Sequence, residues 1–199
     1  MNIITDAFFN ALLADATYAL EDRRYQNLTP TQLIGLLSER MTPRLAEYVG
    51  NNFTIIDHYE SDDTWGSGFD ATVWKRNDGK IYVTMQGTTG LGDFLTDADL
   101  TLGNGAPARQ IVDMVNWWLR ISTPLGVEIK QIGMINVPIP VTGSLLPSYF
   151  YETTPATGEG LVTGGSQATV NGHSLGGALA STFANLFNGS SVAVSGVQT

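Results

Sequence analysis

The chain has 199 residues, of which 43% are hydrophobic, and its formal net charge is −9. That size and composition suit one globular domain with a hydrophobic core. The negative charge argues against binding to nucleic acid and against polybasic attachment to anionic lipid, because both of those surfaces are themselves negative. The chain contains no cysteine, so it has neither a disulfide framework nor thiolate chemistry.

The sequence shows no cleavable secretory signal and no membrane-spanning segment. No apolar run reaches the length of about 18 residues that a transmembrane helix needs. Asp6 and Asp15 interrupt the first part of the chain, which lacks the basic and then apolar pattern of a secretory signal. These features fit a cytoplasmic protein, and equally one exported by a route that uses no N-terminal signal, so the location stays open.

The first 50 residues predict a helical lead-in. Thr5 or Asp6 can cap a helix that runs to about Asp22. Thr29 and Thr42 each precede a proline, and proline is favoured at the first position of a helix. We therefore expect two more short helices, the second of which ends near Gly50.

Strands and helices are then predicted in turn. We expect strands over 53–59, 69–75 and 80–86, a helix over 106–122, a strand over 167–171, a helix to about 187 and a strand over 192–197. Asn77-Asp78-Gly79 is a strong signal for a hairpin turn. The alternation in the second half predicts an α/β fold with a mostly parallel sheet and helices on both faces.

The segment 131–166 does not fit this alternation, because it is rich in proline, glycine and scattered apolar residues. Long irregular segments in compact domains are usually functional covers or mobile insertions. The predicted organisation is therefore a helical lead-in over 1–50, a sheet core over 51–130 and 167–199, and an insertion or lid candidate over 131–166.

The strongest chemical signal is Gly172-His173-Ser174-Leu175-Gly176, where a strand is expected to run directly into a helix. A G-x-S-x-G turn of this kind holds its serine in a strained conformation that exposes the hydroxyl. The start of the helix adds free N–H groups and the positive end of its dipole. We therefore predict Ser174 as a nucleophile and the Leu175 N–H as a donor to an oxyanion.

A second signal is Gly87-Thr88, which follows the predicted strand 80–86. Alone, such a pair is more often just a turn. An oxyanion hole, however, needs a donor from a second strand end beside the nucleophile strand, and a threonine there offers both an N–H and a hydroxyl. Thr88 is therefore the second candidate donor.

Two blocks resemble the class 3 lipases, the family that includes the fungal triacylglycerol lipases. Residues 170–180 match around the nucleophile, and residues 86–97 are similar to the family's Gly-Thr/Ser stretch followed by Asp-Trp-Leu-x-Asp. The resemblance implies an α/β-hydrolase fold, Ser174 as nucleophile, and Thr88 with the Leu175 N–H as the oxyanion hole.

The same resemblance implies that Asp97 is a structural aspartate near the site and that residues 89–102 form a lid, so two segments compete for that role. Gln86 departs from the arginine that the family usually has at this position. The family also places its catalytic residues in the order Ser, Asp, His, yet no Asp, Glu or His follows Ser174.

The chain has two histidines. The side chain of His173 is expected to point away from the catalytic face. His58 lies far earlier, and although chain order alone does not exclude it as the base, an ordinary surface or core histidine is the stronger interpretation. We therefore expect an N-terminal portion of an α/β-hydrolase domain that ends after the strand following the nucleophile helix, with the Asp and His in the remaining C-terminal part.

The function expected from these residues is a serine carboxylic-ester hydrolase, in first place a triacylglycerol lipase that forms an acyl-enzyme at Ser174. The alternatives are a phospholipase A1, a short-chain esterase, or a non-catalytic lipase-like binding module if the chain is complete without a catalytic histidine. The expected partner is a lipid or ester substrate, with a lipid–water interface as one setting, and not nucleic acid. No cofactor is expected, and calcium stays open.

Overall fold

The computed structural model describes residues 3–20, 27–61, 67–87, 106–141, 144–162, 168–187 and 194–197. The chain forms two compact units, of which the first combines Met1–Thr89 with Gly164–Thr199 and the second is Gly90–Thr163. Within the described ranges, no helix combines the length and the apolar character needed to cross a membrane.

Helices lie where the helical lead-in was predicted, but the first helix begins at Ile3, before the predicted cap at Thr5 or Asp6. The lead-in consists of α1 (Ile3–Thr17), the 3-10 turn η1 (Tyr18–Leu20), α2 (Pro30–Leu37) and α3 (Pro43–Asn52). At the start of α2, the Gln32 N–H donates to the Thr29 hydroxyl, and the Thr29 N–H donates to the Gln32 side chain at 2.9 Å. This reciprocal capping satisfies two N–H groups that have no partner inside the helix.

The first unit contains a five-stranded sheet in the order β1-β2-β3-β6-β7. Its strands are β1 (Phe53–Glu60), β2 (Asp70–Arg76), β3 (Ile81–Met85), β6 (Ala168–Gly172) and β7 (Val194–Val197). The predicted turn between β2 and β3 is confirmed, with Gly79 at a φ of 90°. The strand positions thus agree with the prediction to within two residues.

The prediction of a mostly parallel α/β-hydrolase sheet is wrong. β1 pairs with β2 and β2 with β3 in antiparallel fashion, and only the β3–β6 and β6–β7 pairs are parallel, so the sheet is mixed. Parallel neighbours need a connection of a dozen or more residues, and the links after β1 and β2 are shorter than that. The prediction applied the strand–helix alternation of the second half of the chain to the whole sheet. The first three strands, β1 to β3, are instead joined by short connections and pair antiparallel.

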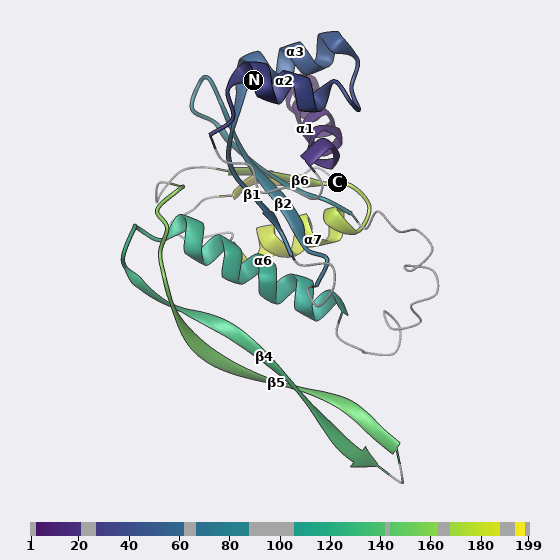
Figure 1. Cartoon of the computed structure of the whole chain (residues 1–199), viewed down its shortest axis with the longest axis vertical. Coiled ribbons are helices and arrows are strands. Elements are labelled where there is room, and N and C mark those ends of the chain that lie inside the picture. Colours follow the sequence, from purple (N-terminus) through teal and green to yellow (C-terminus); the bar gives the residue numbers. More distant parts are fainter. Residues whose placement is uncertain are drawn as a thin grey trace. The chain divides into compact units, whose positions relative to one another are not determined.

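Helices cover both faces of this sheet around β6. Asn171 donates to the side chain of Asn10 on α1 at 3.2 Å. The next residue, Gly172, faces the backbone of Gly176 in α7 (Leu175–Phe187). Successive strand residues point to opposite faces, so α1 and α7 lie on opposite sides of the sheet, as Figure 1 shows. The core on the α1 side contains Phe9, Leu13, Leu33, Val49, Phe53 and Trp74.

The described part of the second unit contains the predicted helix α6 (Ala106–Ser122) and a long hairpin, β4 (Glu128–Val141) with β5 (Ser144–Thr157). The Asn116 side chain joins α6 to β4, because it donates to the Ile132 carbonyl and accepts from the Ile132 N–H, both at 2.8 Å. Most of the segment expected to be irregular is therefore regular. Its prolines suggested loops, whereas Pro138 and Pro147 lie opposite each other in the hairpin.

Candidate active site

Ser174 lies in the turn between β6 and α7, and its side chain is exposed. Its φ is +56°, in the left-handed region that costs a non-glycine residue roughly 1–2 kcal/mol. Among the described residues, only one other non-glycine has a positive φ, Asn27, and asparagine tolerates that region. The turn is fixed by the Gly177 N–H, which donates to the Ser174 carbonyl at 2.9 Å.

Close backbone contacts explain two of the glycines in this turn. A Cβ on Gly172 would overlap the carbonyl of Gly176, and a Cβ on Gly176 would overlap the carbonyl of Met85 at the end of β3. A Cβ on Gly177 would lie 3.5 Å from the Gly172 carbonyl oxygen, which is ordinary contact. Gly172 and Gly176 are therefore required by the packing, and Gly177 is not.

Of the two predicted oxyanion donors, only Leu175 lies within the described residues. Leu175 is half-buried and is the first residue of α7. Because of this position, its N–H has no acceptor within the helix and lies at the positive end of the helix dipole. Thr88 lies outside the described residues, as do Asp97 and the segment 89–102. Gly87, just before Thr88, would place a Cβ 3.0 Å from the Ser174 Cβ. The residues that follow β3 thus reach the turn at Ser174.

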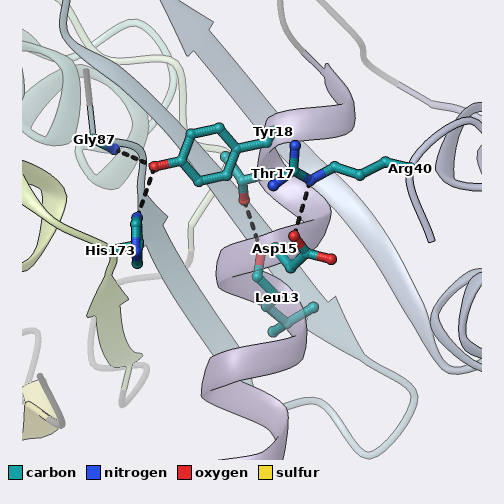
Figure 2. A network of polar contacts seen from close by, with 7 residues as sticks. All are labelled: Leu13, Asp15, Thr17, Tyr18, Arg40, Gly87 and His173. Carbon is teal, nitrogen blue, oxygen red and sulfur yellow. Dashed lines mark hydrogen bonds and ion pairs between the residues drawn. The ribbon is translucent and has the colours of Figure 1, made fainter. Parts of the chain in front are cut away.

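Tyr18 completes a network that the sequence analysis missed (Figure 2). The Gly87 N–H donates to the Tyr18 hydroxyl at 3.1 Å, and this hydroxyl lies 3.2 Å from Nδ1 of His173. The Arg40 guanidinium lies over the Tyr18 ring, 4.8 Å from its centre, and Arg40 pairs with Asp15 at 2.9 Å. The turn η1, the residue Gly87 after β3 and the turn at Ser174 therefore meet at one phenol oxygen.

No local signal marked Tyr18. It stands in a run of small residues at the end of a predicted helix, where an aromatic side chain is ordinary core material. The chain changes from α to 3-10 geometry at this residue, which alters the direction of its side chain. Its contact with His173 spans 155 positions, so only the folded sheet brings the two together.

His58 is buried on β1. Its Nδ1 lies 2.8 Å from the Thr72 hydroxyl and 3.8 Å from an Asp70 carboxylate oxygen. Burial lowers the pKa of His58 from 6.5 to about 4, and this outweighs the Asp57 charge and the Leu20 backbone, which raise it. His58 is therefore neutral near pH 7.

His58 is too far from Ser174 to act as its base. In the sheet register, His58 faces Thr72, Thr72 faces Thr84, and Thr84 faces Asn171. Three strand spacings separate His58 from Asn171, which is roughly 14 Å. A base must lie within hydrogen-bond reach of the proton that it takes. His58 is thus a core residue of the sheet.

The described residues contain no group of three or more acidic or histidine side chains that could hold a metal ion. We compared the chain with protein-family models, with curated proteins and with solved structures, and found no match. The resemblance to class 3 lipases therefore depends on the two sequence blocks alone.

Proposed function

We propose that this protein is a serine carboxylic-ester hydrolase with Ser174 as its nucleophile. The observation that carries the proposal is the backbone of Ser174, an exposed serine with a φ of +56° between a buried strand and the first turn of a helix. Backbone strain of this kind concentrates at active sites, where the surrounding structure maintains it. A turn without a chemical role would gain stability from a glycine at this position.

The chemistry follows from this geometry. The Ser174 oxygen attacks the ester carbonyl, and its proton passes to a general base. The carbonyl oxygen becomes negative and is stabilised by the Leu175 N–H. The lipase resemblance implies that Thr88 is a second donor to this oxygen. The alcohol then leaves, and water hydrolyses the acyl-enzyme. No histidine–carboxylate pair lies at Ser174 among the described residues, because the pair that includes His58 is buried across the sheet.

Labelling with a fluorophosphonate probe tests the nucleophile directly. We expect the wild-type protein to be labelled and to hydrolyse p-nitrophenyl octanoate, and Ser174→Ala to do neither. Ser181→Ala is the matched control, because Ser181 lies on the same helix and its hydroxyl only donates to the Gly177 carbonyl. An unlabelled wild-type protein would instead favour a non-catalytic binding module.

We extend the proposal to lipid substrates, and in first place to triacylglycerol. The support is the surface of the β4–β5 hairpin, where Ile135, Val137 and Phe150 are 43%, 43% and 51% exposed. Ile135 and Phe150 are cross-strand partners, and Val137 lies two positions along the same face. An exposed apolar patch of this kind is typical of contact with a lipid surface or another protein.

Substrate preference separates lipase from esterase. We expect faster hydrolysis of emulsified tributyrin than of dissolved p-nitrophenyl acetate. The double variant Ile135→Ser and Phe150→Ser should lose most of the activity on the emulsion and keep that on the dissolved ester. Thr157→Ser, on the same hairpin, serves as control. Equal activity on both substrates would indicate a short-chain esterase, and preference for phosphatidylcholine vesicles would indicate a phospholipase A1.

A further inference from the structure

The Tyr18 hydroxyl has one proton to donate and two lone pairs that can accept. The Gly87 N–H uses one lone pair, at 3.1 Å. The neighbour on the other side is Nδ1 of His173, at 3.2 Å. When that nitrogen is unprotonated, the Tyr18 proton is donated to it. The result is a chain of hydrogen bonds from Gly87 through Tyr18 to His173.

The same hydroxyl lies near the turn that carries Ser174. The position that a Cβ on Gly87 would occupy is 3.2 Å from the Tyr18 oxygen and 3.0 Å from the Ser174 Cβ. The phenol oxygen, the Ser174 Cβ and the His173 carbonyl oxygen therefore border the same side of Gly87. In the tetrahedral intermediate, the negative oxygen is two bonds away from the Ser174 oxygen, and an ester that turns it toward Gly87 also turns it toward the phenol.

We propose that Tyr18 is a further catalytic residue, which donates its O–H to the ester oxygen that becomes negative when Ser174 attacks. This inference depends on the proposed ester hydrolysis. No proton is transferred: the O–H hydrogen bond moves from Nδ1 of His173 to the substrate oxygen and returns when the intermediate collapses. His173 is exposed, so water can replace Tyr18 as the partner of its ring nitrogen.

Charge makes this exchange favourable. An oxyanion is a stronger acceptor than a neutral ring nitrogen, and hydrogen bonds to charged groups are about twice as strong as neutral ones. The Gly87 N–H polarises the phenol and so strengthens its donation. Arg40 over the ring, itself paired with Asp15, holds the phenol in place before the substrate arrives. A donor held in advance needs no reorganisation during the reaction.

Tyr18→Phe is the decisive variant, because it keeps the ring beneath Arg40 and removes only the hydroxyl. We expect kcat for p-nitrophenyl octanoate to fall about 100-fold with KM almost unchanged, as for the loss of other oxyanion donors. The affinity for a trifluoromethyl ketone, which forms a tetrahedral adduct with the serine, should fall by a similar factor. Tyr48→Phe, which removes a hydroxyl from an exposed tyrosine of the same unit, should change neither quantity.

The outcomes separate this inference from the proposed function. If the wild-type protein shows no turnover that depends on Ser174, both fail. If turnover depends on Ser174 and Tyr18→Phe keeps kcat within threefold, Tyr18 is not an oxyanion donor and the hydrolase proposal survives. If Tyr18→Phe raises KM and lowers the melting temperature but leaves the ketone affinity unchanged, Tyr18 only anchors the turn. That result would also overturn its catalytic role.

Discussion

Gly176, in the first turn of α7, lies with its backbone directly against the carbonyl of Met85 at the end of β3. No side chain fits between them. This contact sets the start of the helix against the strand end, and with it the position of Ser174 relative to Gly87. The arrangement of the candidate site therefore depends on a contact between backbones.

Gly176→Ala should destabilise the protein by about 3 kcal/mol, because the new methyl group meets a carbonyl that cannot move away. Gly177→Ala is the matched control: its methyl group makes only ordinary contact, and alanine favours the helix by up to about 1 kcal/mol. Urea denaturation of the two variants measures the difference. If both unfold at the same urea concentration, the close contact at Met85 is not present in solution.

Ser174→Gly should be more stable than Ser174→Ala by about 1 kcal/mol, since glycine adopts a positive φ without strain. Both variants should lack hydrolase activity. Ser181→Gly, within α7, should instead lower stability, because glycine weakens a regular helix. Thermal unfolding with calorimetry is the measurement, and a Ser174→Gly protein less stable than Ser174→Ala would argue against a strained serine.

His58 should make the protein less stable in mild acid. Its folded-state pKa of about 4 lies below the ordinary value of 6.5, so between these pH values the unfolded chain binds a proton that the folded chain does not. The free energy of unfolding therefore falls as the pH drops through 6.5, by roughly 2–3 kcal/mol on reaching pH 4.

Replacement by a residue that does not titrate isolates this effect. In His58→Gln the free energy of unfolding should depend less on pH between 6.5 and 4, while the carboxylates contribute equally to both proteins. Denaturant unfolding at a series of pH values provides the two curves. Parallel curves would mean that His58 is accessible to protons in the folded state. Because His58 is far from Ser174, Ser174-dependent activity at pH 7 should persist in any folded His58→Gln protein.

Arg40→Met should lower kcat several-fold, less than Tyr18→Phe, because the Tyr18 ring loses the cation above it but keeps its hydroxyl. The loss of stability should be at most about 1 kcal/mol, since the ion pair with Asp15 is exposed. Arg44→Met, an exposed arginine on α3, is the control for the change of charge. A kcat equal to that of Arg44→Met would show that the ring stays in place without Arg40.

Local features could be predicted from the sequence, and long-range ones could not. The strand-to-helix turn at Ser174 was predictable because its glycines and its serine lie within five consecutive residues. The direction of β1 and β2 depends on the lengths of the connections between the strands. The prediction followed the strand–helix alternation of the second half of the chain and did not take these lengths into account. The β4–β5 hairpin was hidden by prolines, and the prediction of Thr88 as a donor remains a prediction. Tyr18 could not be found, because its partners lie at the far end of the chain.

The contact between Tyr18 and His173, 155 residues apart, also bears on how the protein reaches its folded state. Closing so long a loop has a large entropic cost, so such contacts form late, after local helices and hairpins. During synthesis, α1 to α3 leave the ribosome long before β6 and the turn at Ser174. We therefore expect helical circular dichroism to recover first after dilution from denaturant, and esterase activity to return only with the final closure of the sheet.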